Sequence, residues 1–306
     1  MTFPNPARRD TLFAHLAMLL HASLIAGSFT FGAMAVPFLD PAPLNAVRFI
    51  LATMMMGIAA LVIGKEPLRL PTAPWRFAML GLLMGTYFVS MFIALTLTEP
   101  IATSAVFTLI PLMTAAFGFL VLKQRTGPRV LASLVFAGVG SLWVIFRGDL
   151  EALLRFQVGR GEMVYFVGCI CQAAYIPLLR LFNRGEGSLG LTFYTLFATA
   201  AWIILYAAPQ LSGVDWFALP GLVWWVLLYL AIFPTAVSFF LLQYASSRLP
   251  AAKTLAYGYL TPVIVIMLEG VLGHGWASLG IAFGAAVTVV GLVIMAFSPD
   301  REVRAG

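Results

Sequence analysis

Long runs of apolar residues alternate with short polar connections along the whole chain. A helix needs about 20 predominantly apolar residues to cross the hydrocarbon core of a bilayer. Ten runs approach or reach this length, so the pattern predicts an all-α integral membrane protein with ten transmembrane helices. The runs are residues 12–36, 42–64, 75–97, 100–122, 129–146, 163–182, 189–208, 216–245, 251–272 and 275–297.

The connections are short and rich in residues that break helices, as in Asp40-Pro41-Ala42-Pro43 and Thr126-Gly127-Pro128. The longest connection, residues 147–162, divides the ten runs into five and five. We therefore expect two halves, residues 1–147 and 163–306, joined by an external connection at residues 148–162. Within it, residues 150–156 predict a short surface helix.

One stretch of the chain occurs twice. Residues 98–146 recur 151 positions later without a gap, so that Pro111 falls on Pro262 and Gly140 falls on Gly291. Each copy consists of two apolar runs, the first broken by a proline near its middle. A two-fold repeat of membrane helices is a known plan for transporters, in which the substrate binds between the halves.

Composition supports a membrane protein. Hydrophobic residues make up 61% of the chain and charged residues only 10%, whereas a soluble domain carries about 25% charged residues. The net charge is +6, but the basic residues stand singly or in pairs, which argues against a nucleic-acid partner. Cys169 and Cys171 are two apart within one run and form no CxxC pair, so we interpret them as core residues. The first run, at 25 residues, is too long for the core of a cleaved signal peptide.

Lysine and arginine are distributed unequally between the two sides of the predicted bundle. The side of the N-terminus holds fourteen: Arg8, Arg9, Lys65, Arg69, Arg76, Lys123, Arg125, Arg129, Arg180, Arg184, Arg248, Lys253, Arg301 and Arg304. The opposite side holds three: Arg147, Arg155 and Arg160. Cytoplasmic loops are enriched in these residues, so both termini are expected in the cytoplasm. Because each half has an odd number of helices, the second enters the membrane upside down, which predicts two inverted five-helix repeats.

Two glycine pairs predict close helix contacts. Gly81 and Gly85 lie four apart in the third run, and Gly280 and Gly284 lie four apart in the tenth. Small residues at this spacing share one helix face and let the backbones of two membrane helices approach.

Several short motifs together resemble a known transporter family. They are Ala26-Gly27-Ser28-Phe29 in the first run, Asp40-Pro41 and Ala46-Val47-Arg48-Phe49 at the second, Ala94-Leu95 at the end of the third, and Tyr259-Leu260-Thr261-Pro262 in the ninth. This set resembles the EamA branch of the drug/metabolite transporters, and within it the YddG-type exporters of aromatic amino acids. The resemblance implies ten helices, alternating access and location in a bacterial-type inner (plasma) membrane. The chain departs from the family pattern at Lys123-Gln124 and His274-Gly275, where a glutamate commonly closes the proline-containing helices.

The sequence lacks the motifs of an enzyme. His15, His21 and His274 are scattered, and neither an HExxH motif nor a phosphate-binding loop occurs. We therefore expect no catalytic residues, no metal and no cofactor.

Only two ionisable residues stand well inside the predicted spans, Arg48 and Glu269. Such residues are functional candidates because a charge within a bilayer is expensive. We expect them to form an ion pair; the alternative is that Glu269 faces an outer vestibule. The near absence of acids at mid-depth also predicts weak or no dependence of transport on a proton gradient.

Uncharged polar and aromatic residues recur near the middle of the predicted helices. The expected substrate-binding set is Ser28, Tyr87, Ser90, Ser104, Phe107, Thr108, Gln172, Tyr175, Ser238, Tyr257 and Tyr259, with Thr235 at the same depth. Rings supply apolar contact and hydroxyl groups orient a polar end, which suits a small neutral or zwitterionic solute. Pro111 and Pro262 are expected to act as hinges, because each loosens its helix locally.

The function that the family resemblance implies is export of amino acids, especially aromatic or hydrophobic ones, and of related small metabolites, and the uncharged polar and aromatic positions agree with it. The alternative is an exporter of drugs or cationic aromatic compounds, since aromatic rings also bind cations. A channel or scaffold subunit is a weaker alternative, because no candidate for a selectivity filter is found. The expected partners are the small-molecule substrate and the lipid bilayer, and the expected assembly is a monomer.

Overall fold

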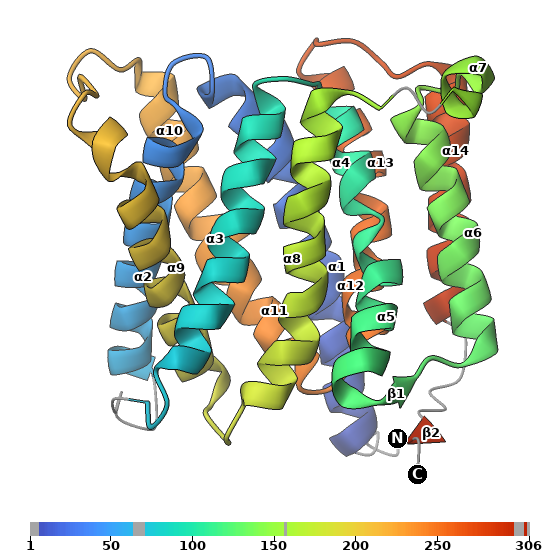
Figure 1. Cartoon of the computed structure of the whole chain (residues 1–306), viewed down its shortest axis with the longest axis horizontal. Helices are drawn as coiled ribbons and strands as arrows, with labels where there is room; N and C mark the ends of the chain where they lie inside the picture. The colour runs from blue at the N-terminus through green and yellow to red at the C-terminus, as the bar shows by residue number, and fades with distance from the viewer. Residues whose placement is uncertain (1–5, 64–70, 156–157, 297–302, 305–306) are drawn as a thin grey trace, which may run out of the picture.

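The protein is a bundle of long helices that stand side by side, with most of their connections gathered at the two ends (Figure 1). The computed structural model describes residues 6–63, 71–155, 158–296 and 303–304. Up to the middle of the chain the elements are α1 (Pro6–Ala35), α2 (Pro41–Ile63), α3 (Trp75–Leu95), α4 (Pro100–Phe107), α5 (Ile110–Leu122), β1 (Gln124–Arg125), α6 (Pro128–Ile145) and α7 (Leu150–Leu154). They continue with α8 (Arg160–Phe182), α9 (Ser188–Leu211), α10 (Gly221–Ala231), the π-helix η1 (Ile232–Val237), α11 (Ser238–Ser246), α12 (Ala251–Ala256), the 3₁₀-helix η2 (Tyr257–Leu260), α13 (Thr261–Val271), α14 (Leu279–Ala296) and β2 (Val303–Arg304).

Eight helical segments of the described chain are long and apolar enough to cross a membrane. They are Asp10–Ala35, Pro41–Val62, Trp75–Leu95, Pro100–Leu122, Pro128–Ile145, Arg160–Phe182, Ser188–Leu211 and Gly221–Ser246. Each coincides with one of the first eight predicted runs. The ninth and tenth runs form shorter apolar helices, Tyr257–Val271 and Leu279–Met295, so a count of ten crossings stays a prediction.

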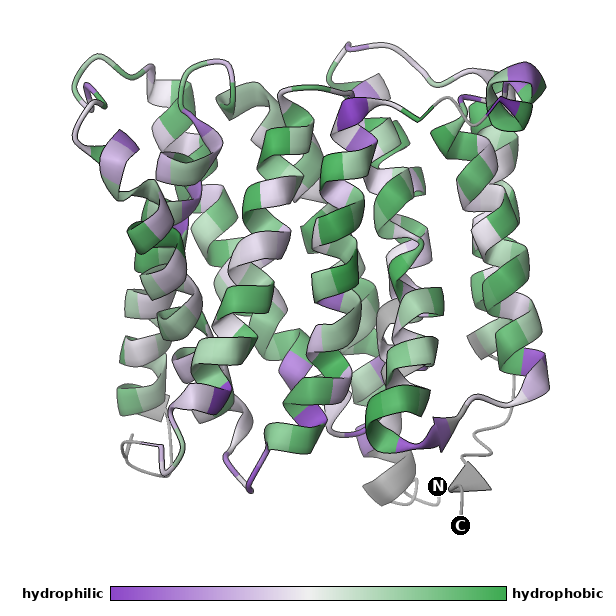
Figure 2. Ribbon diagram, viewed as in Figure 1, coloured by the Kyte–Doolittle hydropathy of each residue, from purple (hydrophilic) through white to green (hydrophobic). Residues whose placement is uncertain are grey.

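Apolar side chains cover much of the outside of the bundle. Leu61, Leu205 and Phe283 are 72%, 68% and 66% exposed, although each lies well within or near the end of an apolar helix. Figure 2 shows hydrophobic residues along most of the length of the helices, while the strongly hydrophilic ones gather mainly near the two ends. A surface of this kind is suited to lipid, because only a hydrocarbon environment removes the cost of exposing so much apolar area.

Three segments depart from a regular α-helix beside a proline. The helix breaks between Phe107 and Ile110, just before Pro111; η2 ends at Leu260, two residues before Pro262; and η1 contains Pro234. Proline lacks the N–H group that would bond to the carbonyl four residues earlier, so a regular helix is interrupted there. The sequence identified the first two of these breaks but not the third.

The helices of the repeated stretch correspond at the offset of 151 residues. α4 and α12 begin at Pro100 and Ala251, and α5 and α13 begin at Ile110 and Thr261. α6 and α14 match at both ends. In Figure 1, α4 lies above α5 whereas α12 lies below α13, so the two broken segments run in opposite directions. The two stretches therefore share the same order of helix, break and helix.

The contact between α6 and α14 is itself nearly symmetric. A Cβ atom added to Gly140 would lie 2.7 Å from the backbone oxygen of Gly284, and one added to Gly291 would lie 2.9 Å from the backbone oxygen of Ser133. Moving each residue to its partner 151 positions away converts the first contact into the second. The two contacts are therefore equivalent under the offset of 151 residues.

The predicted close contact at Gly81 is also found. A Cβ atom at this position would lie 2.6 Å from the backbone carbonyl carbon of Ala198 on α9, and Gly85 lies next to Ile203 of the same helix. The small faces predicted on the third and tenth runs are thus confirmed as helix interfaces.

The start of α1 and the end of the described chain lie at the same end of the bundle (Figure 1). β2 pairs antiparallel with β1, with Gln124 opposite Arg304, next to the connection between α5 and α6. The predicted surface helix is present as α7, whose N-terminus is capped by Asp149 through hydrogen bonds from two backbone N–H groups. Some residues on which the topology prediction rests lie outside the described residues, namely Lys65, Arg69 and Arg301, as do Thr2, Phe297 and Gly306.

Candidate functional site

Arg48 is fully buried on α2, where it faces a π-helix in the second half of the chain. Its Nε donates a hydrogen bond to Thr235 Oγ1 at 2.5 Å. Its Nη2 donates to the backbone oxygen of Pro234 at 3.3 Å and to Ser28 Oγ at 3.4 Å. Arg48 thus joins α1, α2 and η1, which come from opposite halves of the chain.

The π-helix provides these acceptors because of its proline. Pro234 cannot donate to the carbonyl of Leu230, and the hydroxyl of Thr235 donates to that carbonyl instead, at 2.7 Å. Having given its only proton to Leu230, the Thr235 hydroxyl can only accept from Arg48. Pro234 O in turn accepts from Ser238 as well as from Arg48. Single turns of π-helix often mark functional sites.

No acid of the described chain forms an ion pair with Arg48, and its Nη1 has no hydrogen-bond partner. The guanidinium carbon lies instead 4.5 Å from the centre of the Phe88 ring and 5.4 Å from that of Phe92. Cation–π contacts of this kind stabilise a desolvated charge by about 2 kcal/mol. They replace only part of what an anion would supply, because burying a charge costs several kcal/mol.

The predicted ion pair between Arg48 and Glu269 is therefore wrong. Glu269 lies on α13, which packs on α1, α4 and α14, whereas α2 packs on α3, α9, α10 and η1. Glu269 Oε2 contacts His274 Nδ1 at 2.8 Å, and its Oε1 has no partner. Glu269 is 7% exposed, so the alternative of a carboxylate open to an outer vestibule is not realised in this conformation either.

Four aromatic rings form a cluster beside the break between α4 and α5. Tyr87 lies 5.7 Å from Tyr165 and 6.5 Å from Phe107, and Phe29 lies 5.9 Å from Phe107 and 6.1 Å from Tyr165. The hydroxyl of Tyr165 donates to that of Tyr87 at 3.1 Å. Phe107 also covers Gly258, on the repeat-related segment, where any side chain would collide with its ring. Phe107 therefore contacts both the aromatic cluster and the repeat-related broken segment.

The aromatic cluster and Arg48 are parts of one site. Ser28, which bonds to Arg48, is followed directly by Phe29, and Phe88, which covers the guanidinium group, directly follows Tyr87. The ring of Phe88 also lies 4.7 Å from the ring of Tyr87, and this contact connects the guanidinium group to the aromatic cluster. A cationic donor and a set of aromatic faces lie next to each other inside the bundle.

The other predicted site residues are all buried, but they divide into separate groups. Ser90, Ser104 and Thr108 donate to backbone oxygens three residues earlier in the chain. Tyr175 accepts from Gln243 at 3.3 Å and lies 6.5 Å from Phe239, which stacks on Phe88; it is thus connected to the Arg48 group.

Gln172 is 5% exposed, and its Oε1 has no partner. The backbone oxygen of Ser238 contacts His21 Nδ1 at 3.0 Å, and the hydroxyl of Tyr257 contacts His15 Nδ1 at 2.6 Å. Tyr259 points the other way: its hydroxyl donates to Leu134 O on α6, in a cluster with residues of α6 and α14. Of the predicted set, the structure places Tyr87 and Phe107 in one aromatic cluster, and Ser28 in contact with Arg48.

Some residues of the site escaped the sequence argument. Phe29, Phe88 and Tyr165 were indistinguishable from core aromatics in an apolar run, and His21 was judged only by its spacing from the other histidines. Pro234 offered a signal, because a proline in the middle of the eighth run marks an irregular helix in the same way as Pro111 does. Among the described residues, no group of three or more His, Cys, Asp or Glu could hold a metal ion.

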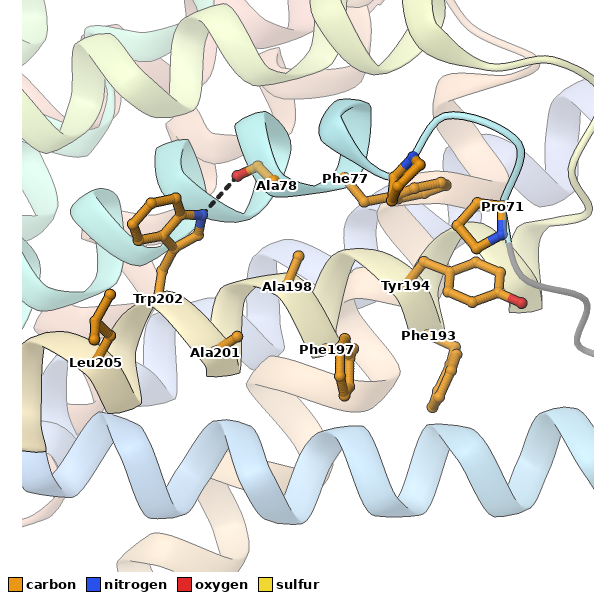
Figure 3. Close-up of a pocket in the computed structure, with 11 residues that line it drawn as sticks. Pro71, Phe77, Ala78, Phe193, Tyr194, Phe197, Ala198, Ala201, Trp202 and Leu205 are labelled. Atoms are coloured by element: carbon orange, nitrogen blue, oxygen red, sulfur yellow. Dashed lines mark hydrogen bonds between the residues drawn. The ribbon is translucent and has the colours of Figure 1, made fainter.

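An apolar groove on the outside of the bundle lies apart from this site (Figure 3). It has a volume of about 540 Å³ and is formed by α3, α9 and the segment before α3. Phe197, at 59% exposed, and Trp202 project from α9, and the indole of Trp202 donates to Ala78 O at 2.8 Å. The exposed rings suit contact with lipid chains rather than with a polar solute.

An ion pair connects α3 to the loop after α8. Arg76 is 1% exposed, and it contacts Glu186 at 2.7 Å and the backbone oxygens of Ala73 and Phe182. Partial burial raises the pKa of the Glu186 carboxyl, but the hydrogen bonds from Arg76 and from the backbone of Arg184 outweigh this and leave the pKa below its usual value. The pair holds α3, α8 and α9 together at this end of the bundle.

Comparisons with known proteins agree with this architecture. Relatives include the uncharacterized transporter YyaM of Bacillus subtilis, 26% identical over 84% of this chain and 85% of that protein. An uncharacterized transporter of Archaeoglobus fulgidus is 24% identical over 92% of this chain and 96% of that protein. A WAT1-related protein of Arabidopsis thaliana is 22% identical over 84% of this chain and 80% of that protein. One solved crystal structure has the same fold, with a TM-score of 0.72 and 21% identity over 96% of this chain and 99% of that one.

The profile of one family matches each half of the chain separately, at residues 12–146 and at residues 159–297. Together the two matches cover nearly all of the predicted helices. The chain is therefore a multi-pass membrane protein of the EamA-like transporter family.

Proposed function

We propose that this protein exports amino acids, especially aromatic and hydrophobic ones, and related small metabolites across the inner membrane. The observation that carries the proposal is the buried cluster of Tyr87, Tyr165, Phe107 and Phe29 next to the unpaired guanidinium of Arg48. Aromatic faces bind an apolar side chain, and the polar groups beside them orient the charged end of a zwitterion.

Transport proceeds by alternating access between two inverted five-helix repeats, which we place at residues 1–147 and 163–306, joined by an external connection at residues 148–162. The separate family match to each half, the offset of 151 residues and the reciprocal α6–α14 contact support this arrangement. Ten crossings follow if the two shorter apolar helices also span the bilayer. The substrate then binds at the midplane between the repeats.

The predicted binding residues are at most 8% exposed. A solute reaches them only when the helices around the cluster separate. Pro111 and Pro262 lie at the breaks that permit such movement, and we assign them as its hinges. We assign Ser28, Tyr87 and Phe107 as the central contacts. The remaining predicted residues, Ser90, Ser104, Thr108, Gln172, Tyr175, Ser238, Tyr257 and Tyr259, are assigned to the walls of the path that opens.

The orientation follows from the distribution of basic residues. With fourteen lysine and arginine residues on the side of the N-terminus and three on the other, both termini are placed in the cytoplasm. Lipid is the proposed surrounding, and a single chain contains both repeats, so a monomer is sufficient for transport.

The test is transport by the purified full-length protein in liposomes. Labelled tryptophan and phenylalanine are expected to move, and alanine to move less well. Phe107→Ala and Tyr87→Ala each remove a ring contact worth about 0.5–1.5 kcal/mol, which predicts a loss of apparent affinity for aromatic solutes of about two- to tenfold.

Phe197→Ala is the matched control, because it removes a lipid-facing ring of the same kind. Transport of an aromatic cation in preference to tryptophan would favour the alternative of a cationic-compound exporter. If no amino acid moves, or if Phe197→Ala has the same effect as Phe107→Ala, the proposal is wrong.

A further inference from the structure

Arg48 is a charge that lacks its anion. Arginine within a membrane span is rare and is normally paired, because the desolvated charge costs several kcal/mol. Here the three hydrogen-bond partners are neutral, namely two hydroxyl groups and a backbone carbonyl. No described acid pairs with it, and the aromatic rings around it offer only a partial substitute. A negative charge brought by a ligand would complete this environment.

The free part of the guanidinium group has the geometry of a carboxylate receptor. Nε is held by Thr235 at 2.5 Å, which fixes the side chain on the π-helix. Nη2 makes only long contacts, at 3.3 and 3.4 Å, and Nη1 makes none. These two nitrogens form one edge of the fork, and a carboxylate binds such an edge through two parallel hydrogen bonds.

We infer that Arg48 binds the carboxylate of the transported solute through Nη1 and Nη2. The inference rests on the proposed function and names the group by which its substrates are recognised. The ring of Phe88, which covers the guanidinium group, lies 4.7 Å from the ring of Tyr87, so a ligand held here places the rest of its structure toward the aromatic cluster. The ligand class is therefore carboxylates with an apolar or aromatic group a few bonds away.

The same arrangement selects against cations. A positively charged group at this point meets an unneutralised guanidinium in a medium of low dielectric constant, where repulsion between like charges is strong. Aromatic rings alone would accept a cationic amine as readily as an amino acid. Arg48 thus decides between the two classes of substrate that the rings leave open.

Three probes that differ only at the carboxyl end test the inference: tryptophan, tryptophanamide and tryptamine. Each is used to compete with labelled tryptophan in liposomes containing the wild-type protein. Tryptophan is expected to compete at least about tenfold better than the amide, since hydrogen bonds between two charged groups are about twice as strong as those between neutral groups. Equal competition by tryptophan and tryptophanamide would overturn the inference without reference to any variant.

The Arg48→Gln variant is expected to lose this preference for the carboxylate, through weaker competition by tryptophan and unchanged competition by the amide. A purely structural role would weaken both probes equally, and that result contradicts the inference. Arg48→Lys keeps the charge but not the fork, so an intermediate preference is expected.

Thr235→Val is the second variant, because Arg48→Gln removes a buried group and can fail to fold. It removes the acceptor that fixes Nε but leaves the guanidinium present, so the preference for tryptophan over its amide should be weaker than in the wild-type protein but still measurable. Complete loss of that preference in Thr235→Val, with Arg48 present, would overturn the inference. Thr199→Val is the matched control, since Thr199 is an equally buried threonine that bonds only to its own helix. If neither tryptophan nor its analogues are transported, the proposed function itself is wrong. If they are transported without a preference for the carboxylate, the proposed function stands and only the role of Arg48 is wrong.

Discussion

The close contact between α6 and α14 allows a quantitative test of the packing between the repeats. In a Gly140→Ala variant the new Cβ atom would lie 2.7 Å from the backbone oxygen of Gly284 and 2.9 Å from Val287. An ordinary contact for such an atom begins at 3.4 Å, so the two helices must separate by about 0.7 Å or bend. The obstacle is backbone, which cannot rotate away as a flexible side chain can.

Overpacking of this kind destabilises a protein by about 1–3 kcal/mol. Gly138→Ala is the matched control, because Gly138 is buried on the same helix and a Cβ atom there meets nothing within 4 Å. Both variants gain the same helix propensity of about 1 kcal/mol, so the difference between them isolates the collision. At about 2–4 °C per kcal/mol, Gly140→Ala should unfold about 2–12 °C below Gly138→Ala.

The assay is thermal unfolding of each purified variant in the same detergent, followed by the loss of the monodisperse peak in gel filtration. Gly291→Ala is expected to behave like Gly140→Ala, because the two glycines occupy equivalent places in the near-symmetric contact. If Gly140→Ala unfolds at the same temperature as Gly138→Ala, the close approach of the two helices and the symmetry drawn from it are wrong.

Three further predictions concern charge and topology. The hydrogen bonds from Arg76 lower the pKa of Glu186 in the folded protein, so the ionised carboxylate stabilises the fold above its unfolded pKa of about 4.3, and this stabilisation is lost as the pH falls through the folded pKa. Glu186→Gln should therefore reduce the dependence of the unfolding temperature on pH between about pH 3 and 7, and an unchanged dependence would contradict a stabilising role of the pair. Cysteine tags at Thr2 and Gly306 should be protected from a membrane-impermeant reagent in intact cells, and labelling of either would refute the topology. Transport should persist when the proton gradient is dissipated; a collapse that Glu269→Gln abolishes would identify Glu269 as a proton carrier.

The sequence by itself determined the parts of the fold that depend on local hydrophobicity and backbone chemistry. Each of the eight long spans follows from an apolar run, since a membrane helix satisfies its own hydrogen bonds and needs no partner to form. The breaks before Pro111 and Pro262 follow from the missing N–H groups. The close packing at Gly81 and Gly284 follows from residue size, and the offset of 151 residues revealed the relation between α6 and α14.

The tertiary structure decided which faces meet. A helix that is apolar on all sides gives no sign of its rotation about its own axis, so nothing in the sequence turned Tyr259 toward α6 or brought Tyr165 to Tyr87. Arg48 meets Thr235, 187 positions away, only because α2 packs on the π-helix at Pro234. The ion pair expected with Glu269 was an argument from charge alone, whereas packing places the two residues on helices with different neighbours. The chemistry of the site depends on these rotations and neighbours, which are set by side-chain packing throughout the bundle.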